Sequence, residues 1–233
     1  MAAAAGTALA QGDARGANDF WNRKPAAEWT SAEIVQLLSV SPWARSINVQ
    51  LPGTGLAAGA ADPSQQAGQR DPSTAAGGAP PPPLGESRRK SGPARGQIIV
   101  RWESAAPVRE ALRTRLPAAF ADHYVISVEG IEANMLVRPN TKDGVLPELS
   151  PEAQAARLKE GALLAVRGKD PLPAGVIDSI GRFRKTWRFG FSRELLQLTL
   201  TDRDLEFSIK AGGVRFRADF QIREMMYRGA LAV

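Results

Sequence analysis

The chain has 233 residues, of which 43% are hydrophobic, and it carries a formal net charge of +6 at neutral pH. This length suits one medium-sized domain with extensions, the apolar content is enough for a packed core, and the positive charge favours anionic partners. The sequence has no cysteine, which excludes disulfides, cysteine-ligated zinc, iron–sulfur clusters and thiol nucleophiles. No apolar run approaches the ~20 residues that cross a bilayer, so we predict no membrane span.

The first residues of the chain are small and rich in alanine. Ala8-Leu9-Ala10 followed by Gln11 fits the small-x-small pattern that signal peptidase cuts, and the stretch before it is typical of the end of a secretory apolar region. We therefore predict that residues 1–18 are a signal-peptide remnant with a disordered start, and that the protein is periplasmic or secreted. The alternative is an alanine-rich disordered N-terminus that is not a signal.

A Trp-rich segment follows at residues 19–51. Thr30 and Glu33 match a capping box, in which each side chain pairs with the backbone N–H of the other residue. The apolar spacing after it predicts a helix over 31–40, and alternating apolar residues predict a short strand over 47–51. A helix of this length is marginal alone, so we expect the segment to pack on the main domain.

Three of the five tryptophans lie in this segment, at Trp21, Trp29 and Trp43. Large aromatic side chains can anchor a short segment to a neighbouring domain. Alternatively, they can form a stacking platform for sugars or bases, which makes these three residues candidate binding residues.

Residues 52–96 have the composition of a linker. They include nine Gly, eight Pro and nine Ala, with few larger apolar side chains. Such a stretch cannot bury enough apolar surface to offset the entropy of ordering its backbone, so we predict a disordered linker.

Residues 97–233 are predicted to form the main domain. Alternating apolar residues predict strands at 98–102 and 124–128, and an apolar stripe between them predicts a helix over 104–116. A strand–helix–strand unit of about 30 residues is typical of a parallel crossover.

The rest of the domain combines one more helix with many strands. Ser150 begins a helix that ends near Gly161, and a strand follows it. Alternating apolar residues then predict further strands at 187–191, 196–200, 205–209, 214–220 and 229–233.

Gly212-Gly213 is a two-residue hairpin signal. It pairs Ile209 with Phe216 and places the apolar residues of both strands on one face. The whole pattern predicts an α+β fold with a mixed, mainly antiparallel sheet and two or three helices, in addition to the Trp-rich helical segment and the disordered linker.

Catalytic and metal-binding motifs are absent from the sequence. His123 is the only histidine, and the Gly190–Glu194 stretch departs from a nucleophile elbow because Glu194 replaces its second glycine. Asp202, Asp204 and Glu206 would share a face of a strand and could bind Ca²⁺ or act as an acid pair, or they are a solvated face. We predict no cofactor, no metal and no enzymatic activity.

Basic and aromatic residues alternate between Arg182 and Arg193. The basic members considered as candidate binding residues are Arg182, Arg184, Lys185 and Arg188. This interleaving occurs on RNA-binding sheets, and it also occurs on a core strand that has a basic outer side. Export would argue against nucleic acid as the partner.

Several short sequence motifs, taken together, resemble those of one protein family. They are Trp21-Asn22-Arg23-Lys24-Pro25, Glu28-Trp29, Ser41-Pro42-Trp43-Ala44, Val100-Arg101-Trp102-Glu103-Ser104-Ala105, Phe191-Ser192-Arg193 and Met226-Tyr227-Arg228-Gly229-Ala230-Leu231. The set resembles a family of uncharacterised exported proteins of soil bacteria. The resemblance implies export and a pairing of the Trp-rich segment with the main domain, and it implies no catalytic residues.

The leading hypothesis is an exported, non-enzymatic binding or envelope-associated protein, whose partner would be an envelope protein or an anionic polymer. One alternative is a cytosolic module that binds nucleic acid or another polyanion, with salt-dependent affinity. A second alternative is a hydrolase that uses carboxylates.

Overall fold

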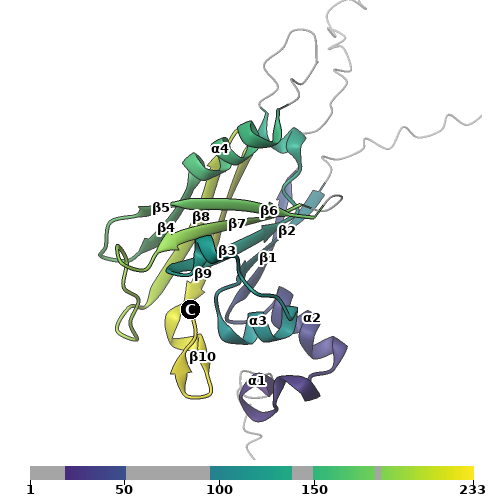
Figure 1. Ribbon diagram of the computed structural model, residues 1–233, viewed down its shortest axis with the longest axis vertical. Helices are drawn as coiled ribbons and strands as arrows, with labels where there is room; N and C mark the ends of the chain where they lie inside the picture. Colours follow the sequence, from purple (N-terminus) through teal and green to yellow (C-terminus); the bar gives the residue numbers. More distant parts are fainter. Residues whose placement is uncertain (1–18, 51–94, 138–148, 182–184) are drawn as a thin grey trace, which may run out of the picture.

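The computed structural model describes residues 19–50, 95–137, 149–181 and 185–233 (Figure 1). The predicted signal-peptide remnant at 1–18 and nearly all of the predicted linker at 52–96 lie outside the described residues.

The strands form two main sheets. The five-stranded sheet has the order β1 (Ala44–Gln50), β2 (Arg95–Trp102), β3 (His123–Glu129), β7 (Thr186–Ser192) and β6 (Val176–Ile180). The four-stranded sheet has the order β5 (Leu172–Pro173), β4 (Ala162–Val166), β8 (Asp204–Ala211) and β9 (Val214–Gln221). A small hairpin of β10 (Met226–Tyr227) and β11 (Ala230–Leu231) lies near the C-terminus. Neighbouring strands pair antiparallel throughout the described chain, which confirms the predicted α+β class with mainly antiparallel strands.

The helices lie at two ends of the molecule. They are α1 (Phe20–Arg23), α2 (Ser31–Ser39), α3 (Ala106–Leu112) and α4 (Pro151–Gly161), with short 3-10 helices at Ala26–Glu28, Ala118–Phe120, Ala133–Leu136 and Ile222–Glu224. The first three α-helices lie together at one end, and α4 lies at the other (Figure 1). None of the helices in the described ranges is long and apolar enough to cross a membrane, as the sequence predicts.

Helix α2 begins at the predicted capping box. The Thr30 hydroxyl accepts a hydrogen bond from the Glu33 backbone N–H at 3.2 Å, and the Glu33 carboxylate accepts one from the Thr30 backbone N–H at 2.8 Å. Both orphan donors at the helix start are therefore satisfied locally. Ser150 caps α4 in a similar way, by accepting a hydrogen bond from the Ala153 backbone N–H at 3.2 Å.

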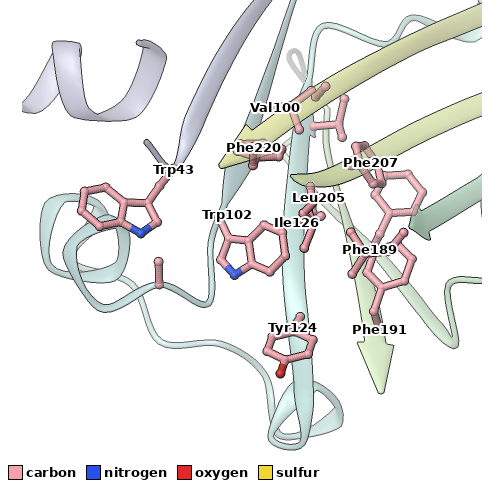
Figure 2. Packing of buried hydrophobic residues seen from close by; sticks show 14 of the residues in the cluster. Trp43, Val100, Trp102, Tyr124, Ile126, Phe189, Phe191, Leu205, Phe207 and Phe220 are labelled. Atoms are coloured by element: carbon pink, nitrogen blue, oxygen red, sulfur yellow. The ribbon is translucent and has the colours of Figure 1, made fainter. Parts of the chain in front are cut away.

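The core lies between the two sheets (Figure 2). Trp102 of β2 meets Phe220 of β9 with ring centroids 5.8 Å apart, and Phe189 of β7 meets Phe207 of β8 at 5.7 Å. Such tilted and edge-on contacts are the preferred geometry of aromatic pairs, so these rings add to the apolar area that the sandwich buries.

The β8–β9 hairpin has the register that the sequence predicts. Ile209 lies opposite Phe216, and the strands meet at Gly212, whose φ is +58°. A Cβ at Gly212 would lie 1.9 Å from the Leu136 carbonyl oxygen, so the turn needs glycine both for its φ and for its space. The like-charged residues Glu206 and Asp219 do lie opposite each other, and Arg217 offsets them by contacting both, at 3.4 Å and 3.3 Å.

The predicted parallel crossover is wrong. Strands β2 and β3 pair antiparallel, with Ile99 opposite Glu129 and Trp102 opposite Ile126. Helix α3 has seven residues and is about 10 Å long, whereas β2 has eight residues and is about 26 Å long. The helix is therefore too short to carry the chain back along the strand, and the connection instead turns at one end of the sheet.

The predicted strand at 196–200 is also wrong, because this stretch is irregular. The Leu198 backbone N–H donates to the Tyr124 hydroxyl at 3.1 Å, and the Thr199 backbone N–H donates to the Asp202 carboxylate at 2.8 Å. These side-chain partners take the place of a strand ladder.

Candidate functional site

The three tryptophans of the N-terminal segment are buried. Trp21 meets Trp43 edge-on with ring centroids 5.4 Å apart, and Phe20 meets Trp29 edge-on at 5.7 Å. Trp43 has no exposed surface, and its indole N–H donates to the Ala232 carbonyl oxygen at 2.7 Å. Rings packed in this way anchor the segment to the domain and do not offer their faces to a ligand.

The edge of this aromatic cluster borders a cavity. The cavity is about 450 Å³ in volume, and its lining includes Trp21, Arg45 and Met226. Arg45 is half-buried there, with its guanidinium 5.1 Å from the centre of the Phe220 ring, and burial lowers its pKa. Trp21 therefore reaches a hollow at the junction of the two chain ends, although most of its ring lies in the core.

The basic run at Arg182–Arg193 does not form an exposed basic surface in its described part. Arg182 and Arg184 lie outside the described residues. Lys185 places its Nζ 5.5 Å from the centre of the Trp187 ring. Arg188 is only 5% exposed, and its Nη2 lies 2.6 Å from the Glu103 carboxylate, which is 2% exposed. The expected basic outer side of β7 is thus covered at Arg188, because its ion-pair partner comes from the end of β2.

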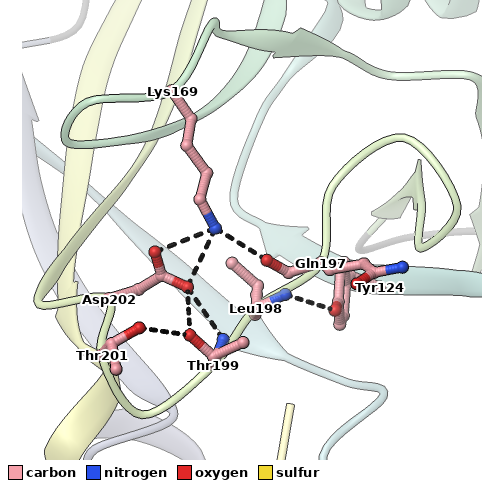
Figure 3. A network of polar contacts seen from close by, with 7 residues as sticks. All are labelled: Tyr124, Lys169, Gln197, Leu198, Thr199, Thr201 and Asp202. Carbon is pink, nitrogen blue, oxygen red and sulfur yellow. Dashed lines mark hydrogen bonds and ion pairs between the residues drawn. The ribbon is translucent and has the colours of Figure 1, made fainter.

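Of the three carboxylates considered for catalysis, Asp204 and Glu206 share the outward face of β8, and Asp202 lies outside the strand. Asp202 precedes β8 and lies in a turn, where it accepts hydrogen bonds from Thr199 and pairs with Lys169 at 2.9 Å (Figure 3). Burial raises the pKa of Asp202, but the hydrogen bonds from Lys169 and Thr199 outweigh it and hold this pKa below its ordinary value. The oxygens of Asp202 are therefore engaged in holding the turn together. Within the described ranges, no three side chains of the metal-ligating types form a metal site.

His123 opens β3 and lies directly opposite Ser192 of β7. The two side chains make no hydrogen bond with each other, and the imidazole packs against Phe120 with ring centroids 6.5 Å apart. A serine–histidine pair is therefore not assembled at this position.

A group of exposed arginines lies at the end of α3. Arg109, Arg113 and Arg115 are all exposed, and they border a depression of about 400 Å³. None of the three forms an ion pair with another described residue. The sequence analysis does not identify this group, because it uses only the apolar residues of the helix to predict its position. The signal was present in the i, i+4 spacing of Arg109 and Arg113 on the polar face.

Two arginines at this surface have unusual backbone conformations. Arg113, the C-cap of α3, has φ +52°, and Arg228 has φ +50°. They are the non-glycine residues with positive φ in the described chain. Glu110 of α3 lies 3.7 Å from Arg228 Nη2 and accepts a hydrogen bond from the Tyr227 hydroxyl at 2.7 Å. We call Arg109, Arg113, Arg115 and Arg228 the arginine surface.

Arg193 and Tyr227 lie close to the arginine surface. Burial lowers the pKa of Arg193, and the positive charge of Arg109 adds to this shift, whereas Tyr124 and Asp122 oppose it. The Arg193 guanidinium lies 4.3 Å from the centre of the Tyr124 ring and donates to the Val233 carbonyl oxygen at 2.7 Å. Burial, together with the hydrogen bond to Glu110, raises the pKa of Tyr227 to about 12, so its phenol stays neutral beside Arg228. The carboxylates of Glu110 and Asp122 offset part of the positive charge here, at Arg228 and at Arg193.

Comparison of the chain with protein-family models, with curated proteins and with solved structures found no match.

Proposed function

We propose that the protein is an exported, non-enzymatic binding protein of the cell envelope, and that it holds an anionic polymer on the arginine surface. Export is supported by Ala8-Leu9-Ala10 before Gln11 and by the resemblance of the Trp-containing phrases to exported proteins. The anionic partner is supported by the net charge of +6 and by the exposed arginines of α3.

The conformation of Arg113 carries the proposal. A left-handed backbone costs a non-glycine residue about 1–2 kcal/mol, and helices commonly place glycine at their C-terminal end for this reason. Arg113 occupies such a position with its side chain exposed and without an ion-pair partner among the described residues. Arg228 repeats the combination of positive φ and an exposed side chain, and it pairs with Glu110 of α3. Strained backbone of this kind concentrates at functional sites.

The mechanism is electrostatic. Arginine forms planar, bidentate contacts with phosphate and carboxylate groups, and its charge persists at every physiological pH. Arg109 and Arg113 lie one helical turn apart, so an extended polymer with regularly spaced anionic groups can contact both. Because these side chains are solvated, affinity depends strongly on salt.

The first test measures binding of a long-chain inorganic polyphosphate to the full chain by isothermal titration calorimetry at low and moderate salt. The double variant Arg109→Gln/Arg113→Gln removes two charges, each worth about 1 kcal/mol near an anionic surface, so affinity should fall about thirtyfold. The matched control Lys210→Gln/Arg215→Gln removes two charges from the β8–β9 hairpin and should change affinity less than twofold.

Equal losses in the two double variants would contradict a defined surface, because net charge alone would then explain binding. Tight binding to duplex DNA with none to polyphosphate would instead support the nucleic-acid alternative. Location is tested separately by the intact mass of the protein from fractionated cells. A periplasmic or secreted species that begins at Gln11 supports export, and a cytosolic species that retains the alanine-rich start contradicts it.

A further inference from the structure

A row of polar side chains crosses the five-stranded sheet on its face away from the core. Arg101 of β2 lies opposite Ser127 of β3, Ser127 lies opposite Arg188 of β7, and Arg188 lies opposite Asp178 of β6. The neighbouring row on the other face contains Trp102, Ile126 and Phe189 of the core. Because side chains alternate between the faces of a sheet, the four polar residues share one face.

Arg101, Ser127 and Arg188 of this row line a cavity of about 230 Å³, together with Glu103 and Glu129, whereas Asp178 lies outside its lining. One wall is formed by Leu112, the last residue of α3, and by Thr114 just after the helix. Another wall is formed by Ile180 and Thr186 of the β6–β7 hairpin. The cavity is distinct from the arginine surface, although Thr114 borders both.

Ser127 lies at the centre of the row without a partner. It is 1% exposed, and its hydroxyl makes no hydrogen bond with the protein. Buried hydroxyls are paired in the great majority of proteins, and an exception calls for a functional explanation. Its place between Arg101 and Arg188 on the cavity wall makes it an available donor and acceptor for a small polar ligand.

Both arginines of the row keep a donor nitrogen available. Arg101 donates through Nε to the Leu38 carbonyl oxygen at 2.6 Å and through Nη2 to Glu129 at 2.8 Å, and its Nη1 makes no hydrogen bond with a described residue. Arg188 donates to Glu103 through Nε at 2.9 Å and pairs with it through Nη2. Its Nη1 lies 3.9 Å from the Asp178 carboxylate, beyond hydrogen-bond distance.

The charges of the cavity nearly cancel. Arg101 and Arg188 are matched by Glu129 and Glu103, which also line the cavity, and the Asp178 carboxylate lies 3.9 Å from Arg188 Nη1. A simple anion would be repelled by these carboxylates. A neutral polyol would carry no charge to pair with the arginines or the carboxylates. A ligand with one positive and one negative group can satisfy both kinds of partner in one small volume.

We propose that this cavity binds a free amino acid or a similarly small zwitterion. The ligand carboxylate accepts hydrogen bonds from the Ser127 hydroxyl and from the Nη1 groups of Arg101 and Arg188. The ligand ammonium group faces the carboxylates of Glu103 and Glu129 in the lining, and a short apolar side chain contacts Leu112 and Ile180. The cavity volume restricts the ligand to small members of this class.

The test is calorimetric titration of the full chain with individual amino acids, including glycine, alanine and serine, with glycerol and glucose as neutral polyols. At least one amino acid should bind, and Ser127→Ala should weaken that binding about tenfold, which is the loss expected for one hydrogen bond to a charged group. The control Ser208→Ala changes a serine of β8 that makes no side-chain hydrogen bond with described residues, and it should bind like the wild type.

A second readout separates ligand binding from a structural role of the hydroxyl. Without ligand, Ser127→Ala should melt at the same temperature as the wild type or higher, because it removes a buried hydroxyl that has no protein partner. It should also leave the binding of polyphosphate unchanged, so this inference and the proposed function can fail independently. Absence of amino-acid binding at millimolar concentrations, binding of polyols alone, or wild-type affinity in Ser127→Ala would each overturn the proposal.

Discussion

The indole N–H of Trp43 donates a hydrogen bond to the carbonyl oxygen of Ala232 at 2.7 Å, across 189 positions of sequence. The bond joins the start of β1 to the last residues of the chain, at a position that has no exposed surface. The Trp-rich segment and the C-terminal end are therefore parts of one cooperative structure.

Trp43→Phe should lower the free energy of unfolding by about 1–3 kcal/mol, because it leaves the buried Ala232 carbonyl without its donor. Urea denaturation monitored by circular dichroism measures the change. Trp29→Phe is the control, since its indole N–H makes a longer bond of 3.3 Å to the nearby Lys24 carbonyl oxygen. An equal loss in both variants would show that lost ring volume, and not the Trp43 hydrogen bond, is responsible.

Glu103→Gln should destabilise the protein by about 3–5 kcal/mol. The substitution leaves the buried Arg188 guanidinium with only the more distant and more exposed Asp178 carboxylate, 3.9 Å from its Nη1, and a poorly neutralised buried charge is costly. The control Glu206→Gln breaks the exposed pair with Arg217 and should cost less than about 1 kcal/mol. Chemical denaturation of both variants at neutral pH makes the comparison, and similar values for the two would contradict the dominant role of burial.

Asp202→Asn should change the dependence of stability on pH. The folded-state pKa of Asp202 lies below its ordinary value, so the ionised carboxylate stabilises the fold above about pH 4. That stabilisation is lost as the pH falls through the lowered folded-state value. The variant should therefore be less stable than the wild type near neutral pH, and the two should converge in strong acid.

Urea midpoints across the acid range measure this convergence. The control Asp204→Asn removes a neighbouring charge whose side chain makes no ion pair or hydrogen bond with described residues. It should leave the shape of the pH profile unchanged. A constant difference between Asp202→Asn and the wild type at every pH would exclude titration of Asp202 as the cause.

Gly212→Ala should destabilise the β8–β9 hairpin more than Gly168→Ala destabilises its own turn. Both glycines have positive φ, so both variants lose about 1–2 kcal/mol from backbone strain. A Cβ at Gly212 also meets the Leu136 carbonyl oxygen, whereas a Cβ at Gly168 meets no atom within 4 Å. The difference in melting temperature between the two variants measures the steric contribution at Gly212. Equal losses of melting temperature in the two variants would show that this contribution is absent.

Local signals in the sequence predicted local structure well. The capping box at Thr30 and Glu33 depends on atoms three residues apart, and the register of β8 and β9 follows from a two-residue turn with apolar residues on one face. In both cases the interacting groups are close in sequence, so the pattern contains the information that the fold uses.

The incorrect predictions concern groups whose partners lie far away in the sequence. The sequence predicts Arg188 as a binding residue or as part of a basic outer side, because its buried partner Glu103 is 85 residues away and cannot be read from its neighbourhood. The alternation at Leu196, Leu198 and Leu200 predicted a strand, but the Tyr124 hydroxyl and the Asp202 carboxylate bind that backbone instead. The polar row of Arg101, Ser127 and Arg188 depends on the order of the strands, which the sequence did not predict.

The pairing of β1 with β2 has a consequence for the integrity of the chain. All seven residues of β1 pair with β2, and the buried tryptophans add their contacts, so residues 19–50 are held by noncovalent interactions along their whole length. A single cut between residues 51 and 94 should leave two fragments that migrate together under native conditions and separate in denaturant. Their reassociation would then be bimolecular and would depend on concentration, so a synthetic peptide of residues 19–50 should restore the fold of the remaining fragment in trans.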